Sequence, residues 1–345
     1  MPERPQALFA MTARHVPRLF PPDLLGRLRE HVDLDPALVA QDFTDPATRE
    51  TLARTEVLIS GWGCPRLDAA VLDAAPGLRA VLHAAGSVKG FTTPEVWRRG
   101  ILVSSAAGAN ALPVAEYTLA MILLAGKDVL ARRDRLRGHR TQPTDRTHRT
   151  GDFGPGSGGE LGNHGRRVGI VGASRVGRRL IELLRPFDLR VTLTDPYVDE
   201  AEAARLGVPL LTLDDLLRTC DTVTLHAPAT PETRHLIGAR ELALMPAGSV
   251  LINTARGALI DHDALIGELR TGRLSAVLDV TDPEPRPADS PLFDLPSAFV
   301  TPHLAGSEGN ELARLGRTVV EEAARLVAGD GLRYAVDLAE LERTA

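Results

Sequence analysis

Arg256, Glu284 and His303 each follow a run of apolar residues long enough for a buried strand. Reduction of a 2-oxo acid by hydride transfer needs a cation for the substrate carboxylate, a proton donor for the carbonyl oxygen, and a group that orients the donor. Arginine, histidine and glutamate are residue types suited to these three tasks. Because open α/β sheets bind ligands at the carboxyl ends of their strands, we expect the three side chains to meet in one crevice.

Each of these residues also has an ordinary interpretation when it is taken alone. Arg256 could cap a helix at the surface, His303 could be a loop histidine with satisfied hydrogen bonds, and Glu284, between two prolines, could simply be solvated. Their succession after three strands favours the chemical interpretation.

A glycine-rich turn precedes these residues in the chain. It places Gly172 and Gly177 at the first and third positions of a G-x-G-x-x-G pattern, with Ser174 at the second. In such a loop the glycines permit a tight turn, close approach of a pyrophosphate, and close packing of helix on strand. The phosphate then sits at the helix N-terminus. The pattern predicts a dinucleotide site, with a ligand-free βα turn as the alternative. The Ser174 side chain narrows the space through which the pyrophosphate approaches the backbone.

Asp195 follows the next apolar run, 23 positions after Gly172. A carboxylate at this place accepts hydrogen bonds from the ribose hydroxyls of a dinucleotide. It would also repel the 2′-phosphate of NADP, so the sequence favours NAD.

Six apolar runs separated by helical patterns make up most of the second half of the chain, which is typical of a parallel sheet with crossover helices. We predict strands at Val168–Val171, Arg190–Thr194, Thr222–His226, Val250–Asn253, Ala276–Val280 and Ala298–Thr301, and helices at Gly177–Leu184 and Asp263–Thr271.

The first third of the chain shows the same alternation. We predict strands at Ala7–Met11, Val57–Ser60, Ala80–His83 and Ile101–Ser104, and helices at Pro22–His31, Asp68–Ala75 and Val114–Leu130. Pro113 stands where a helix can begin.

Two further segments decide the domain organisation. Residues 131–149 carry seven arginines and residues 151–165 carry seven glycines, so we predict an exposed connection over about 131–165. The arginines could bind phosphate or nucleic acid, but an exposed arm or a subunit contact is favoured because no aromatic residues interleave. An amphipathic helix over about Glu311–Ala328 has no strand partner nearby, and we expect it to return to the first α/β unit.

The sequence therefore predicts an α/β protein with two doubly wound, Rossmann-like parallel-sheet domains and an active-site cleft between them. The substrate domain is discontinuous, from residues 1–112 and 306–345, and residues 113–305 form the NAD-binding domain.

The composition argues against several other classes of protein. The 345 residues are 43% hydrophobic and 25% charged, as in globular domains. A net charge of −5 and 4% aromatic residues give no overall basis for binding nucleic acid or an anionic membrane. No apolar run approaches the ~20 residues of a membrane span. Cys64 and Cys220, 156 positions apart, form neither a metal-ligand pair nor a disulfide framework, so we expect a cytoplasmic protein without a metal site.

The motifs resemble those of the D-isomer-specific 2-hydroxyacid dehydrogenases over nearly the whole chain, least before residue 50. The resemblance is carried by Gly108-Ala109-Asn110 with Val114-Ala115-Glu116, Val168–Gly177, His226-Ala227-Pro228 with Pro231-Glu232-Thr233-Arg234, Asn253–Gly257, Asp279–Pro285 and Thr301–Gly306. It implies that NAD-dependent hydride transfer interconverts a D-2-hydroxy acid and its 2-oxo acid. It further implies that Arg256 binds the substrate carboxylate, that His303 gives and takes the proton, and that Glu284 orients His303 and favours its protonated form.

The same resemblance implies which residues surround the cofactor and the substrate. The cofactor set is Gly172, Ser174, Arg175, Val176, Gly177, Asp195, Pro196, His226, Ala227, Pro228, Thr233, Thr254, Ala255, Asp279, His303 and Gly306. The substrate carboxylate would bind the loop at Gly86, Ser87 and Val88 together with Arg256. Lys89 replaces the usual aspartate of this loop, and it either recharges the substrate pocket or is a surface lysine. The resemblance also implies a homodimer with its contact in residues 113–150.

Two alternative functions stay open: an NAD(H)-binding scaffold or co-regulator of the same fold, and a related dehydrogenase acting on formate or phosphite. The presence of Arg256, Glu284 and His303 favours the enzyme. Glyoxylate, hydroxypyruvate, pyruvate and larger oxo acids are all candidate substrates.

Overall fold

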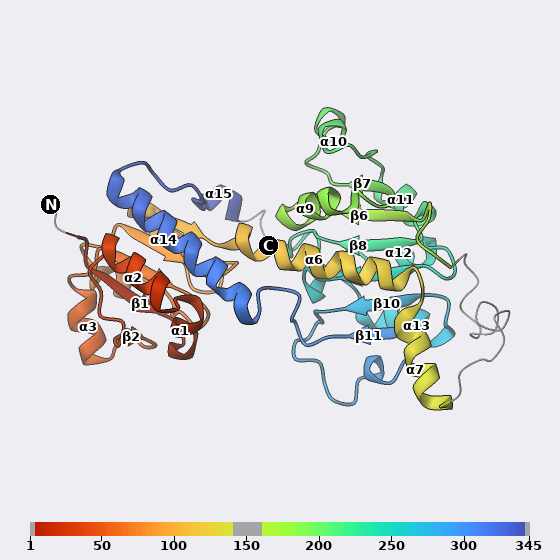
Figure 1. Cartoon of the computed structure of the whole chain (residues 1–345), viewed down its shortest axis with the longest axis horizontal. Helices are drawn as coiled ribbons and strands as arrows, with labels where there is room; N and C mark the ends of the chain where they lie inside the picture. The colour runs from red at the N-terminus through yellow and green to blue at the C-terminus, as the bar shows by residue number, and fades with distance from the viewer. Residues whose placement is uncertain (1–3, 141–160, 342–345) are drawn as a thin grey trace. The chain divides into compact units, whose positions relative to one another are not determined.

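A computed structural model describes residues 4–140 and 161–341 of the chain (Figure 1). Its contacts divide the chain into two units. One comprises the residues up to Ala111 and those from Ser307 onward, and the other comprises Leu112–Gly306. Each unit is built on a parallel sheet, which confirms the predicted fold class of two parallel-sheet α/β domains.

The first unit has five strands in the order β2-β1-β3-β4-β5, all parallel. The strands are β1 (Ala7–Ala10), β2 (Val39–Ala40), β3 (Val57–Ser60), β4 (Ala80–His83) and β5 (Leu102–Ser105). Every residue of β1, β3 and β4 is buried. Strands covered on both faces read as unbroken apolar runs, which is why the sequence shows them clearly.

Helices cover this sheet, and the last long helix of the chain is one of them. The helices of the first unit are α1 (Val16–Leu19), α2 (Pro22–His31), α3 (Pro46–Leu52), α4 (Ala69–Asp73), α5 (Pro94–Arg98), α14 (Leu312–Ala328) and α15 (Leu338–Leu341). Figure 1 shows α14 beside α2, and Leu315 and Val319 share a core with Phe9 of β1. A side chain at Gly316 would meet the Leu19 carbonyl oxygen at 1.9 Å, so α14 approaches α1 as closely as a glycine allows.

The second unit has six parallel strands in the order β7-β6-β8-β9-β10-β11. The strands are β6 (Arg167–Val171), β7 (Arg190–Thr194), β8 (Thr222–Leu225), β9 (Val250–Asn253), β10 (Ser275–Leu278) and β11 (Ala298–Val300). From β6 the chain first adds β7 on one side and then crosses to β8 on the other. Ligands of open α/β sheets bind at the carboxyl ends of the strands beside such a switch point.

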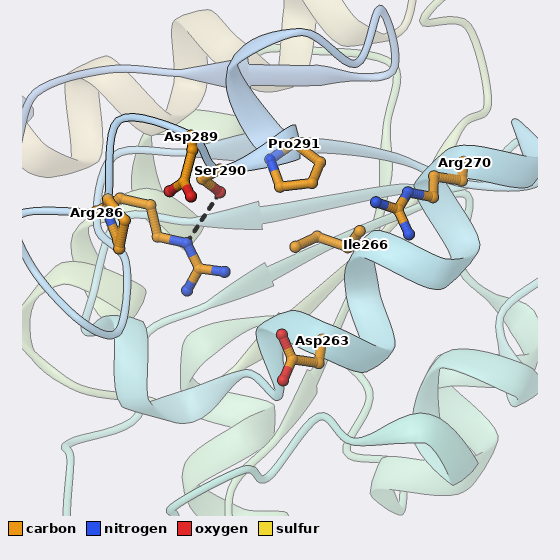
Figure 2. A pocket seen from close by; sticks show the side chains of 8 residues that line it. Asp263, Ile266, Arg270, Arg286, Asp289, Ser290 and Pro291 are labelled. Carbon is orange, nitrogen blue, oxygen red and sulfur yellow. Dashed lines mark hydrogen bonds between the residues drawn. The ribbon is translucent and has the colours of Figure 1, made fainter.

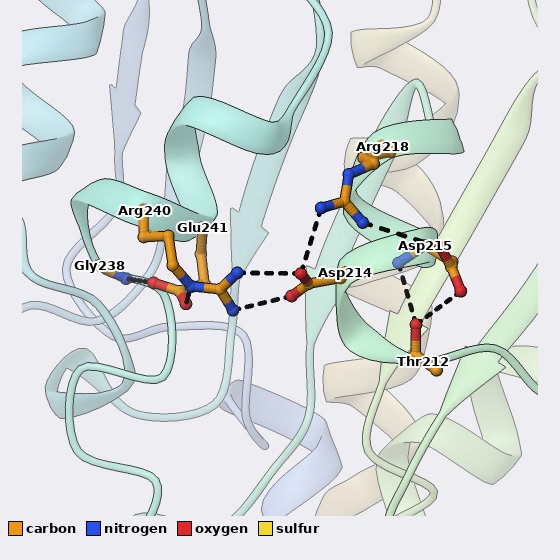
Figure 3. Close-up of polar contacts among 7 residues, drawn as sticks. All are labelled: Thr212, Asp214, Asp215, Arg218, Gly238, Arg240 and Glu241. Carbon is orange, nitrogen blue, oxygen red and sulfur yellow. Dashed lines mark hydrogen bonds and ion pairs between the residues drawn. The ribbon is translucent and has the colours of Figure 1, made fainter.

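The helices of this unit are α6 (Ala107–Ala125), which begins before the boundary, α7 (Val129–His139), α9 (Arg175–Leu184), α10 (Glu200–Leu206), α11 (Leu213–Thr219), α12 (Ala239–Leu244) and α13 (His262–Thr271). Charged side chains join α11 to α12: Asp214 binds Arg240 at 2.8 Å and Arg218 at 3.3 Å (Figure 3).

Two helices differ from the prediction. Pro113 does not begin a helix, because α6 starts at Ala107 and contains it; the alanines at 107, 109 and 111 are strong helix formers and extend the helix upstream. Part of the predicted exposed connection is helical, because 129–139 form α7, in which 133, 134 and 136–138 are exposed. Arginine, leucine and alanine are good helix formers, so the arginine run continues as a helix. Residues 141–160 of the predicted connection lie outside the described residues.

α6 also differs from the expectation that no apolar run reaches membrane-spanning length. Its 19 residues, with a mean hydropathy of 1.3, are long and apolar enough to cross a membrane by length and composition. Ala115 and Ile122 of this helix are fully buried in the same core cluster as Ile170 and Leu180. Core helices of soluble proteins pass the same test of length and composition.

Candidate active site

The turn between β6 and α9 requires two of its glycines. Gly172 has a φ of +102°, and a Cβ there would lie 2.7 Å from the Ala227 backbone nitrogen. A Cβ at Gly177 would lie 2.1 Å from the Gly172 carbonyl oxygen. The first glycine therefore turns the chain against the end of β8, and the third lets the helix pack on the turn.

Ser174, in the place of the second glycine, is the N-cap residue of α9. Its Oγ accepts a 3.4 Å hydrogen bond from the Gly177 backbone N–H, and its backbone is extended. Serine is among the residues most favoured at this position. Arg175 and Val176 form the first turn of α9, with Arg175 exposed and Val176 half-buried. The other amides of this turn can bind a phosphate.

Asp195 lies at the end of β7 and joins the glycine-rich turn directly. Its carboxylate accepts hydrogen bonds from the Ala173 N–H at 2.7 Å and the Tyr197 N–H at 2.8 Å. Each carboxylate oxygen keeps a lone pair for a further donor such as a ribose hydroxyl. Pro196, next to it, is exposed. The glycine cradle, the capped helix and this carboxylate fit the phosphates and a ribose of NAD.

Hydrogen bonds among its own residues and to β8 hold the segment that follows β8. His226 is buried, its Nε2 lies 3.0 Å from Thr224 Oγ1, and burial lowers its pKa to about 3, so the ring is neutral. Thr233 Oγ1 donates to the Pro228 carbonyl at 2.6 Å and accepts from the Thr230 N–H at 2.8 Å. The Thr233 hydroxyl, predicted to be near the cofactor, thus closes the loop that carries Ala227 and Pro228.

The loop after β9 presents Arg256. Asn253 orders this loop, because its side chain accepts from the Ala255 N–H at 3.0 Å and donates to the Arg256 carbonyl at 2.8 Å. The guanidinium of Arg256 donates to the Ala255 carbonyl at 2.6 Å. Burial lowers the pKa of Arg256, and the Glu284 carboxylate opposes that shift, so the two charges interact. The hydroxyl of Thr254 is tied to Thr118 Oγ1 at 2.9 Å.

The loops after β9 and β10 touch through Gly257. A Cβ on this glycine would lie 2.0 Å from the Thr281 carbonyl carbon and 2.5 Å from the Asp282 nitrogen. Any larger residue would push apart the loops that carry Arg256 and Glu284.

His303 follows β11 and is bound to Glu284. The His303 Nδ1 and Glu284 Oε1 atoms lie 2.6 Å apart, and the two side chains are 50% and 42% exposed. A carboxylate is an acceptor only, so Nδ1 carries the proton and donates it to Glu284, which leaves Nε2 to exchange a proton with a ligand. His303 has a φ of +54°, a costly conformation for a residue with a side chain.

Asp279 holds the backbone around His303. Its carboxylate accepts from the N–H groups of Leu304 and Ala305, both at 2.9 Å, and its carbonyl accepts the His303 N–H at 3.0 Å. Asp279, predicted to lie near the nicotinamide, is 2% exposed. The structure therefore brings Arg256, Glu284 and His303 together at the carboxyl ends of β9, β10 and β11, and Asp279 holds the loop that carries His303. Gly306, the last predicted cofactor residue, ends the unit.

The predicted substrate loop belongs to the first unit. Its Gly86 carbonyl accepts a 2.5 Å hydrogen bond from Ser105 Oγ, and Ser87 Oγ accepts one from the Lys89 N–H at 3.4 Å. Val88 is buried in the core of this unit, whereas Lys89 is exposed. Of the three predicted substrate residues, Gly86 and Ser87 thus have partly accessible surfaces.

Sequence reasoning missed Tyr117 and Thr301, whose hydroxyls lie 2.8 Å apart beside Asp279. A tyrosine in an otherwise apolar helical run was the available signal. It also missed His83, which is buried between the Ser60 side chain and the Ser87 backbone. The His83 Nδ1 atom lies 2.9 Å from Ser60 Oγ, and burial lowers the pKa of His83 to about 3.

A separate pocket of about 360 Å³ lies between α13 and the segment 286–291 (Figure 2). Figure 2 shows Arg286 bound to Ser290, with Arg270 beyond Ile266. Two aspartates, Asp263 and Asp289, balance the two arginines. Within residues 4–140 and 161–341, no group of three metal-ligating side chains gathers.

Comparison with known proteins agrees with this geometry. Residues 136–305 match the family described as "D-isomer specific 2-hydroxyacid dehydrogenase, NAD binding domain". The chain is 38% identical over 273 residues to D-3-phosphoglycerate dehydrogenase of Mycobacterium bovis, which covers 79% of this chain and 49% of that protein. It thus spans about half the length of these relatives.

Two other similar proteins are covered over most of their length. Glyoxylate reductase of Korarchaeum cryptofilum is 30% identical, with 91% of this chain and 92% of that protein covered. A crystal structure of a protein from Thermus thermophilus superposes with a TM-score of 0.75 at 30% identity, covering 96% of this chain and 100% of that one. The chain therefore belongs to the D-isomer-specific 2-hydroxyacid dehydrogenase family.

Proposed function

We propose that this protein is an NAD-dependent oxidoreductase that interconverts a D-2-hydroxy acid and its 2-oxo acid. The observation that supports the proposal most is the 2.6 Å contact between His303 Nδ1 and Glu284 Oε1, whose carboxylate also interacts with the half-buried Arg256. An oriented proton donor next to a fixed cation is what a 2-oxo acid requires.

The nicotinamide supplies or accepts the hydride when NAD is bound. Arg256 binds the substrate carboxylate, a role for which a planar guanidinium with several donors is well suited. His303 Nε2 gives its proton to the carbonyl oxygen during reduction and takes it back during oxidation. Glu284 accepts the Nδ1–H of His303, so the ring keeps one orientation and its positive charge is offset.

The turnover of a panel of acids tests this function. The protein is mixed with NADH and with glyoxylate, hydroxypyruvate, pyruvate or a larger oxo acid, and the loss of NADH absorbance is followed. We expect turnover of at least one acid, and a lower rate with NADPH because Asp195 would repel its 2′-phosphate. Tight NADH binding without turnover of any acid would favour the scaffold function. Oxidation of formate or phosphite with NAD, and no reduction of any oxo acid, would favour the third candidate.

A further inference from the structure

A chain of three polar side chains connects helix α6 to the loop of His303. The Tyr117 hydroxyl lies 2.8 Å from Thr301 Oγ1, and Thr301 Oγ1 donates a 2.6 Å hydrogen bond to Asp279 Oδ1. A threonine hydroxyl has a single proton, and that proton is given to the carboxylate. Tyr117 is therefore the donor in its contact with Thr301.

This chain ends on the groups that hold His303 in place. Asp279 Oδ1 also accepts the Leu304 N–H, Oδ2 accepts the Ala305 N–H, and the Asp279 carbonyl accepts the His303 N–H. The positive φ of His303 is unfavourable for a residue with a side chain, so it persists only where the surroundings fix it. The hydrogen bonds to the carboxylate and to the backbone carbonyl of Asp279 supply that constraint.

The same loop is tied to α6 a second time. The Asn110 side chain, in the first part of α6, accepts a 2.9 Å hydrogen bond from the Ser307 N–H. The chain passes from one unit to the other at Ala111–Leu112 and again at Gly306–Ser307. The Asn110–Ser307 contact lies within the first unit and the Tyr117–Thr301 contact within the second, and in the sequence His303 lies between Thr301 and Ser307.

We propose that Tyr117 and Thr301 are positioning residues for His303, acting through Asp279, in the reaction proposed above. Neither residue is required to contact the substrate. Thr301 directs the Asp279 carboxylate toward the Leu304 and Ala305 amides, and Tyr117 anchors Thr301 to α6. Burial raises the pKa of Tyr117, and together with the nearby Asp279 charge it outweighs the lowering by the Thr301 hydrogen bond, so the phenol keeps the proton that it donates.

Three variants and one matched control separate positioning from general stability. Thr301→Val removes the hydroxyl at nearly constant volume, Thr301→Ser keeps it, and Tyr117→Phe removes only the phenol oxygen. The control, Thr222→Val, removes another buried hydroxyl of the same unit, at the opposite end of the sheet, where it accepts from Arg166 at 3.3 Å. Each variant is compared by its Tm, its kcat and KM, and the hydrogen exchange of residues 303–305.

A small displacement of a reacting group costs up to ~10²-fold in rate. We expect kcat of Thr301→Val to fall about tenfold or more, with KM for NADH changed less than about twofold. Thr301→Ser should keep most of the wild-type kcat, and the kcat of Tyr117→Phe should lie between those of Thr301→Val and Thr301→Ser. Amides 303–305 should exchange faster in Thr301→Val than in Thr222→Val. Equal kcat and equal exchange in Thr301→Val and the control would overturn the proposal.

The proposed function and the positioning proposal fail in different ways. If wild-type protein turns over no acid, the proposed function is wrong, and the exchange of amides 303–305 alone decides whether Thr301 orders the loop. If wild-type protein is active and Thr301→Val is as active, the positioning proposal is wrong while the function stands.

Discussion

At the scale of single residues, His303 has a well-defined environment. Its Nδ1 is bound to Glu284, its amide is bound to the Asp279 carbonyl, and its φ is +54°. Its ring is nevertheless half exposed. A side chain that is held on one nitrogen and open on the other is suited to proton exchange with a ligand.

Removal of the imidazole tests the role of His303. His303→Ala should lower kcat at least ~10²-fold, because the carbonyl oxygen then has no positioned proton donor. Glu284→Gln keeps an acceptor oxygen but loses the charge, so its kcat should fall less than that of His303→Ala. Steady-state kinetics with NADH and a 2-oxo acid measure both. His164→Ala, at an exposed histidine of the same unit, is the control. An unchanged kcat in His303→Ala would exclude this residue as the acid.

At the scale of elements, the strands were predictable and several contacts between elements were not. The sequence predicted β3, β4, β7 and β9 with their observed bounds. Strands β3, β4 and β9 are buried throughout and are largely apolar runs, whereas β7 is a partly exposed edge strand of alternating polar and apolar residues. It missed β2, which has only two residues. The Tyr117–Thr301 contact joins positions 184 apart, and no local pattern encodes such a pairing.

The candidate site shows the same division. The strand-end positions of Arg256, Glu284 and His303 were predictable, because ligands bind where parallel strands end. The capping role of Ser174 and the internal bonds of Thr233 were not. Both are loop residues whose hydroxyls bind the backbone nearby, and their partners depend on the conformation of the turn.

The contact between the loops after β9 and β10 leads to a prediction at Gly257. In Gly257→Ala the new Cβ would meet the Thr281 carbonyl carbon at 2.0 Å, so the loops of Arg256 and Glu284 must separate. We expect kcat/KM to fall by up to ~10²-fold and the free energy of unfolding to fall by about 1–3 kcal/mol.

Gly267→Ala is the matched control, because a Cβ at this glycine of α13 meets nothing within 4 Å. Alanine in a helix interior should raise the free energy of unfolding by about 0.5–1 kcal/mol. Steady-state kinetics and urea unfolding measure both variants. Equal activity of the two variants would show that the close approach at Gly257 does not matter for catalysis.

At the scale of the whole molecule, each unit contains a buried neutral histidine. Burial lowers the pKa of His83 in the first unit and of His226 in the second to about 3. The unfolded chain binds protons at these residues near pH ~6.5, whereas the folded chain does not. Their contribution to stability is therefore fully present above that pH and is lost as the pH falls toward 3.

This linkage predicts destabilisation in mild acid. From pH 7 to pH 5 each histidine should lower the free energy of unfolding by about 2 kcal/mol, since ~1.4 kcal/mol is lost per pH unit below ~6.5. Urea unfolding at several pH values measures it. His83→Asn, which does not titrate, should show a shallower decline with falling pH, whatever its stability at pH 7. Equal pH slopes for His83→Asn and wild type would mean that His83 is accessible to protons in the folded state.

The most direct test of the central claim follows the hydride itself. NADH carrying deuterium at both C4 positions of the nicotinamide is incubated with the protein and a 2-oxo acid that it reduces, and the product is analysed by mass spectrometry and chiral chromatography. We predict a D-2-hydroxy acid with deuterium at C2, formed by wild type and at most at about one hundredth of that rate by His303→Ala. A product without deuterium would contradict direct hydride transfer at the site formed by Arg256, Glu284 and His303. A product of the L configuration would contradict the proposed D specificity.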